Sequence, residues 1–95
     1  MAKPKDIPLL VCTAHKGVFF GYGQPTTDKI IRITDARMCV YWSPDTHGIN
    51  GLASDGPGKT SRITPAVPAI TLQDVTAIME CSEKAAEAWS KFTWK

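Results

Sequence analysis

Residues 53–60 read Ala-Ser-Asp-Gly-Pro-Gly-Lys-Thr and satisfy the loose pattern of a nucleotide-binding phosphate loop. Such a loop binds phosphate through backbone N–H groups at the start of a helix, so a strand must precede it and a helix must follow it. Here Pro65 and Pro68 follow closely, and prolines at those positions block a helix in its first two turns. We therefore interpret the match as accidental and expect that the protein is not an enzyme.

The same stretch still carries chemistry for binding an anion. Residues 56–62 read Gly-Pro-Gly-Lys-Thr-Ser-Arg and offer backbone N–H groups, two hydroxyls, an ammonium and a guanidinium. A turn that presents successive N–H groups binds anions without a helix, and arginine adds a forked donor. The candidate ligand-binding residues in this loop are Lys59, Thr60, Ser61 and Arg62. The alternative is a solvated surface loop without a ligand.

Aromatic residues on the expected strands exceed what so small a core can bury if the strands alternate; they are Phe19, Phe20, Tyr22, Tyr41 and Trp42. With arginines on adjacent strands, such a sheet face could stack a base and hold a phosphate. We therefore add Arg32, Arg37, Tyr41 and Trp42 to the candidate site. Alternatively, the 43–69 segment, the helix or a second subunit covers this face. The surplus of aromatic surface predicts a homo-oligomer.

Other catalytic or metal-binding groups are poorly supported. Cys12 and His15 have a metal-like spacing that Cys39, His47 and Cys81 could complete, but zinc sites come as two close pairs and no second pair exists. The three thiols lie in apolar runs rather than in exposed sites that favour the thiolate. The acidic residues fall mainly at turns or on the helix. We expect no catalytic residue, no metal and no cofactor.

Length and charge limit the class of protein. Ninety-five residues with 43% hydrophobic content make one small domain, residues 1–95, with a modest core. The net charge of +2 comes from scattered residues, which argues against a dedicated nucleic-acid surface. No run is long and apolar enough for a bilayer, and the start has no secretory apolar stretch. A cytoplasmic protein is expected.

The first half of the chain is predicted to contain a lead-in, a hairpin and two further strands. Residues 1–7 form a loose lead-in, and 9–14 and 18–22 form a hairpin in which Gly17 supplies a positive φ. Residues 29–34 form a strand with Ile31 and Ile33 facing inward, and 36–42 form a fourth strand.

The second half begins with a Gly- and Pro-rich loop over 43–69, whose apolar segment 49–53 is expected to pack as a short strand. Strand structure returns at residues 70–81 with a bend at Gln73–Asp74, although a helix over 72–80 is an alternative. Residues 82–92 are predicted to form a helix, because Ser82 is a good N-cap and apolar residues recur along one face. Trp89 is expected to anchor that helix.

Several segments together resemble a family of short phage and prophage proteins known only as a domain of unknown function. The segments that carry the resemblance are 17–22, 35–43, 51–53, 65–68 and 72–81, followed by an Ala- and Glu-rich helix that ends at Trp89. The resemblance implies a phage gene product that acts in the cytoplasm of a bacterial host, and it supplies no catalytic residues to transfer.

The combined prediction is an α+β fold: a small β-rich domain with a curled antiparallel sheet or partial barrel of four to five strands and one C-terminal helix at 82–92. The predicted function is non-enzymatic capture of a phosphorylated small ligand, such as a signalling nucleotide, in antagonism of host defence. The alternative is a protein–protein inhibitor that uses the aromatic sheet face against a host protein. Weak nucleic-acid binding is a third possibility.

Overall fold

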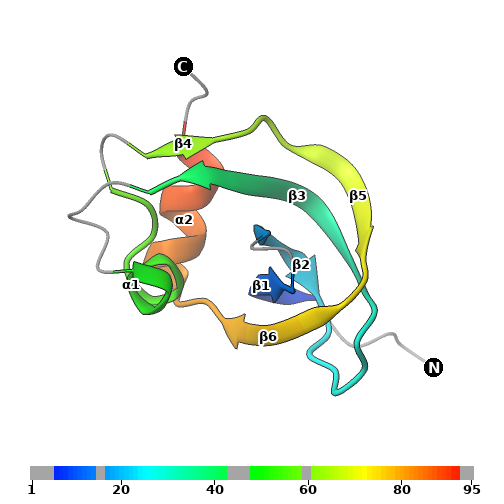
Figure 1. The fold of residues 1–95 in the computed structure, drawn as a ribbon. Helices are drawn as coiled ribbons and strands as arrows, with labels where there is room; N and C mark the ends of the chain where they lie inside the picture. The colour runs from blue at the N-terminus through cyan, green and yellow to red at the C-terminus, as the bar shows by residue number, and fades with distance from the viewer. Residues whose placement is uncertain (1–5, 15–16, 43–47, 59–60, 93–95) are drawn as a thin grey trace.

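Six strands and two helices make up the described part of the chain, which in this computed structural model comprises residues 6–14, 17–42, 48–58 and 61–92 (Figure 1). The strands form one antiparallel sheet in the order β4-β3-β2-β1-β6, with β5 also paired to β3. The predicted β-rich α+β class is confirmed, but the predicted strand number and the single helix are wrong. The elements are β1 (Ile7–Thr13), β2 (Val18–Gly23), β3 (Ile31–Tyr41), α1 (Gly48–Ser54), β4 (Arg62–Ile63), β5 (Val67–Leu72), β6 (Val75–Glu80) and α2 (Glu83–Lys91).

The sheet curls because its two edges are neighbours in the sequence. β5 pairs with β3 and β6 pairs with β1, so the two strands lie at opposite edges, yet only Gln73 and Asp74 separate them. From this turn the ribbons of β5 and β6 diverge (Figure 1). The predicted bend is confirmed, with Asp74 at a φ of 53°, and the helical alternative for 72–80 is wrong.

A bulge between β2 and β3 changes which side chains face inward. Phe20 pairs with Arg37 and Tyr22 with Thr34, so Gly21 lies opposite two residues of β3. Asp35 adopts a φ of 49° at this point, a conformation that Asp tolerates better than most side chains. The close packing needs Gly21, because a Cβ there would lie 2.8 Å from Ile33 Cδ1. β3 therefore continues through the bulge instead of ending at Asp35.

The two faces of the sheet bury separate hydrophobic clusters. The inner cluster lies within the curl and consists of Leu9, Val11, Ile31, Ile33, Ala36 and Leu72. The outer cluster lies between the sheet and the two helices and includes Leu10, Cys12, Phe20, Cys39, Leu52 and Trp89. Alternation along β1 supplies both clusters. The predicted inward positions of Ile31 and Ile33 and the anchoring position of Trp89 are confirmed.

The first hairpin forms as predicted, from β1 and β2. β1 begins at Ile7, within the expected lead-in, and residues 1–5 lie outside the described chain. The role predicted for Gly17 is wrong, because the described glycines with positive φ are Gly48 and Gly56. Gly17 instead leaves room for neighbouring side chains: a Cβ there would lie 2.6 Å from Phe19 Cε1 and 2.7 Å from Thr13 Oγ1, so these groups would have to shift.

The expected loop over 43–69 contains α1, β4 and the start of β5 in its described part. The apolar segment 49–53 was expected as a strand and is a helix, which corrects that prediction. Leu52 and Ala53 of α1 are buried against the outer cluster. The carbonyl groups at the end of this short helix are satisfied from α2 and its cap, because Trp89 Nε1 donates to Leu52 O (3.0 Å) and Ser82 N to Ala53 O (2.9 Å).

The helix predicted at 82–92 is confirmed as α2. Ser82 caps it, with its Oγ accepting a hydrogen bond from Ala85 N at 3.0 Å and donating one to Ser54 O at 2.5 Å. One serine therefore begins α2 and ends α1, which fixes the two helices against each other.

Candidate functional site

The structure separates the residues predicted to form one ligand site. Arg32 is exposed near the start of β3 with Thr71 as its cross-strand neighbour, whereas Tyr41 ends β3 beside Arg62 of β4. The two positions are nine residues apart along β3, which corresponds to a contour length of roughly 30 Å in extended chain. Arg32 is therefore not part of the surface that Tyr41 and Arg62 share.

The Gly-rich loop uses several of its groups within the fold. Gly56 N donates to Gly51 O (3.0 Å), and Ser61 N donates to Gly58 O (3.1 Å). Gly56 has a φ of 88° and lies so close to α2 that a Cβ would approach Ala88 Cβ to 2.5 Å. Ser61 is buried, while Lys59 and Thr60 lie outside the described residues. In the described part of the loop, Gly56 therefore forms part of a turn and packs against α2.

Arg37 is buried and engaged with the C-terminal end of α2. Its Nε donates to Thr64 O (2.7 Å), Nη2 donates to Phe92 O (2.6 Å) and Nη1 donates to Trp89 O. The carbonyls of the last turn of a helix carry the negative end of its dipole, so a guanidinium suits this position. Burial lowers the pKa of Arg37 from its usual value, and arginine keeps its charge in proteins. Arg37 therefore links β3, the β4–β5 connection and α2.

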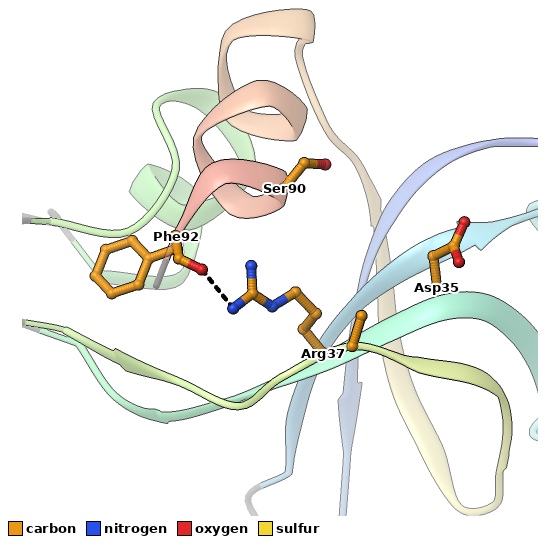
Figure 2. A pocket seen from close by; sticks show the side chains of 5 residues that line it. Asp35, Arg37, Ser90 and Phe92 are labelled. Atoms are coloured by element: carbon orange, nitrogen blue, oxygen red, sulfur yellow. Dashed lines mark hydrogen bonds between the residues drawn. The ribbon is translucent and has the colours of Figure 1, made fainter. Parts of the chain in front are cut away.

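A pocket of about 430 Å³ lies beside this arginine and is lined by Asp35, Arg37, Ala66, Ser90 and Phe92. Figure 2 shows the guanidinium reaching toward Phe92 and away from Asp35. The buried cation is thus directed at the helix carbonyls, and we do not take this pocket as the functional site.

Apolar side chains instead gather at the end of the inner face where β2, β3 and β5 meet. A pocket of about 190 Å³ is lined there by Phe19, Ala36, Arg37, Met38, Thr64, Val67 and Ile70. Met38 is the cross-strand partner of Phe19, and Ala36 that of Val67. Met38, Val40 and Val67 are 37%, 55% and 45% exposed, which is unusual for large aliphatic side chains. We call Phe19, Met38, Val40, Val67 and Ile70 the apolar mouth.

The apolar surface continues along β3 to its end. Val40, Tyr41 and Trp42 line a further hollow of about 280 Å³, and Tyr41 is half exposed beside Arg62. Trp42 is only partly accessible, because it packs against the outer cluster. Of the predicted site residues in the described chain, Tyr41 is therefore next to two others: it lines this hollow with Trp42 and is the cross-strand partner of Arg62.

Sequence reasoning missed Met38, Val40 and Val67 as surface residues. The alternation of 36–42 separates Met38 and Val40 from Arg37 and Cys39, but it does not say which set is buried. The bulge at Asp35 decides this, since it turns Arg37 and Cys39 toward the helices. A polar residue that tolerates a positive φ, opposite a glycine in the next strand, is the signal that could have indicated the bulge.

The thiols are poor candidates for chemistry. Burial raises the pKa of Cys39 to about 11 and that of Cys81 to about 12. Within the described ranges, no group of three or more His, Cys, Asp or Glu residues is placed to hold a metal ion. Neither described helix combines the length and apolar character needed to cross a membrane.

A family model described as "Domain of unknown function (DUF6948)" matches residues 7–89, from the first residue of β1 to the buried tryptophan of α2. The chain belongs to this family. The match spans the six strands, α1 and most of α2, so the curled sheet and its packed helix belong to the matched region. No curated protein and no solved structure matches the chain. The resemblance to a domain of unknown function is thereby confirmed.

Proposed function

We propose that this domain is a non-enzymatic binding protein that engages another protein through the apolar mouth. The observation that carries the proposal is the exposure of Met38 and Val67 around an apolar hollow that Phe19 and Ile70 also line, with Val40 exposed two residues further along β3. Exposed apolar groups gathered around a concave site favour association with a partner, because burying them removes apolar area from water.

The chemistry of the surface indicates the kind of partner. The hollow is lined mainly by apolar side chains and suits an inserted aliphatic or aromatic side chain. Arg62 lies exposed beside Tyr41, which lines the neighbouring hollow with Val40, and its guanidinium favours a carboxylate on the partner. The partner is a protein with an apolar anchor residue flanked by acidic residues.

The resemblance to phage proteins suggests in which cell the partner is found. We place the domain in the bacterial cytoplasm, where the bound protein belongs to the host and its inhibition counters a host defence. The proposed binding surface is the apolar mouth, which combines aliphatic and aromatic side chains, whereas the sequence predicted an aromatic sheet face.

Substitution of the exposed aliphatic residues tests the proposal. With the protein immobilised and challenged with a bacterial lysate, Met38→Asp or Val40→Asp is expected to lower retention of a defined host protein at least about tenfold, because a buried unpaired carboxylate opposes docking. Ile30→Asp is the matched control, since Ile30 is 58% exposed but lies before β3. Equal protein profiles for the wild type and Met38→Asp would refute the proposal.

Capture of a phosphorylated ligand is the second candidate. It is supported by the pairing of Tyr41 with Arg62, next to Ser61 and the predicted residues Lys59 and Thr60. A base stacked on Tyr41 with its phosphate on Arg62 would use both side chains. Calorimetry with nucleotides and cyclic nucleotides is expected to show micromolar binding that Arg62→Gln weakens about tenfold and Met38→Asp leaves unchanged. Absence of heat with every nucleotide excludes this candidate.

A further inference from the structure

β6 has an edge without a strand partner in the described chain. It is the last strand on its side of the sheet, and its other neighbour is β1. Cys81 N donates to Pro8 O of the β1 segment at 3.0 Å, and N–H groups alternate in direction along a strand. The N–H and C=O groups of Ile78 and Glu80 therefore point away from β1, toward the free edge.

Val75 N, at the start of β6, donates to Lys29 O at 3.0 Å. From Thr76 onward this edge lacks the usual protection against pairing. Natural sheets blunt free edges with proline, lysine or a covering segment. β5 carries Pro68, whereas β6 reads Val-Thr-Ala-Ile-Met-Glu, without proline or lysine and with one charge at its end. The ribbons of β5 and β6 also diverge from their turn, so β5 does not cover the edge (Figure 1).

The side chains next to this edge continue the inner cluster. Ile78 is the cross-strand neighbour of Val11 and packs against the inner cluster while remaining partly accessible. A strand added to β6 would therefore form backbone hydrogen bonds with β6. Its side chains would also extend the apolar surface of the inner cluster beyond Ile78.

We propose that β6 pairs antiparallel with β6 of a second copy of this chain, forming a symmetric dimer through a continuous sheet. Residues with outward N–H groups must lie opposite each other, which allows a two-fold axis at Ile78. Ile78 then faces Ile78 of the second copy, and Glu80 faces Thr76. No like charges oppose each other, because Glu80 is the sole charged residue of the strand. The strand is thus complementary to itself.

A backbone block at the free edge tests this dimer independently of the apolar mouth. Native mass spectrometry and sedimentation velocity are expected to show a wild-type dimer and a Glu80→Pro monomer with unchanged circular dichroism, since proline is tolerated where an N–H faces solvent. Glu80→Gln, which keeps the N–H, is the matched control and should remain dimeric. A monomeric wild type, or a dimer that Glu80→Pro leaves intact, would overturn the proposal.

Cross-linking tests the register without depending on the proline variant. Ile78→Cys is expected to form a covalent dimer on oxidation, because directly opposed Cα atoms in a hydrogen-bonded pair lie about 5.5 Å apart. Thr76→Cys on the same strand should give no more covalent dimer than the wild type, whose own three cysteines set the background. Cross-linking through Thr76 but not Ile78 would overturn the proposed register.

Discussion

Arg37→Met is expected to lower the free energy of unfolding by about 3–5 kcal/mol, because a hydrogen bond to a charged group contributes about 1.5–3 kcal/mol and Arg37 makes three that are not fully additive. Methionine preserves much of the apolar stem but leaves the carbonyls of Thr64, Trp89 and Phe92 without their donor. The end of α2 would then separate from β3, and the helix would lose the cation at its negative end.

Urea unfolding measures this loss, and Arg32→Met is the matched control. Both arginines lie on β3, but Arg32 is exposed, so its replacement should change stability by no more than about 0.5 kcal/mol. Equal stability of the two variants would contradict the role assigned to Arg37. Arg37→Lys should fall between them, since an ammonium on a flexible stem cannot reproduce the planar fork.

The two helices show why the sequence predicts some elements and not others. α2 follows from local signals, since Ser82 caps it and Ala85 and Trp89 recur on one face. α1 has Gly48 and Gly51, which oppose a helix, and it is stabilised by hydrogen bonds from distant residues of the α2 segment. No pattern within residues 48–54 reports those contacts.

The candidate site was predicted in part for a similar reason. Tyr41 and Arg62 share a surface because β3 pairs with the short strand β4. These two residues are far apart in the sequence, so local patterns do not report the pairing. Arg37 was expected to bind a ligand because its charge is visible in the sequence while its burial is not. Its direction depends on one extra residue at the Asp35 bulge, which shifts every later side chain of β3 to the opposite face.

Trp89→Ala is expected to cost about 3–5 kcal/mol of stability, the range for truncating a large aromatic in a core. Trp89 is fully buried, and its ring stacks on Phe20 with centroids 5.1 Å apart and planes 6° from parallel. Its Nε1 donates to Leu52 O of α1 at 3.0 Å. One side chain thus joins α2 to the sheet and to α1, so its removal should loosen α1 as well as reduce overall stability.

Two further variants separate these contributions. Trp89→Phe keeps an aromatic ring but loses the indole N–H, and leaving the buried Leu52 carbonyl without this donor should cost about 1–3 kcal/mol. Trp42→Ala removes a tryptophan that is only partly buried against the same cluster and should cost less than Trp89→Ala. Amide hydrogen exchange should rise over 48–54 in Trp89→Phe, because the end of α1 has lost a partner, while the β1–β2 hairpin stays protected. Uniform loss of protection across both regions would show that Trp89 supports the whole fold and has no selective effect on α1.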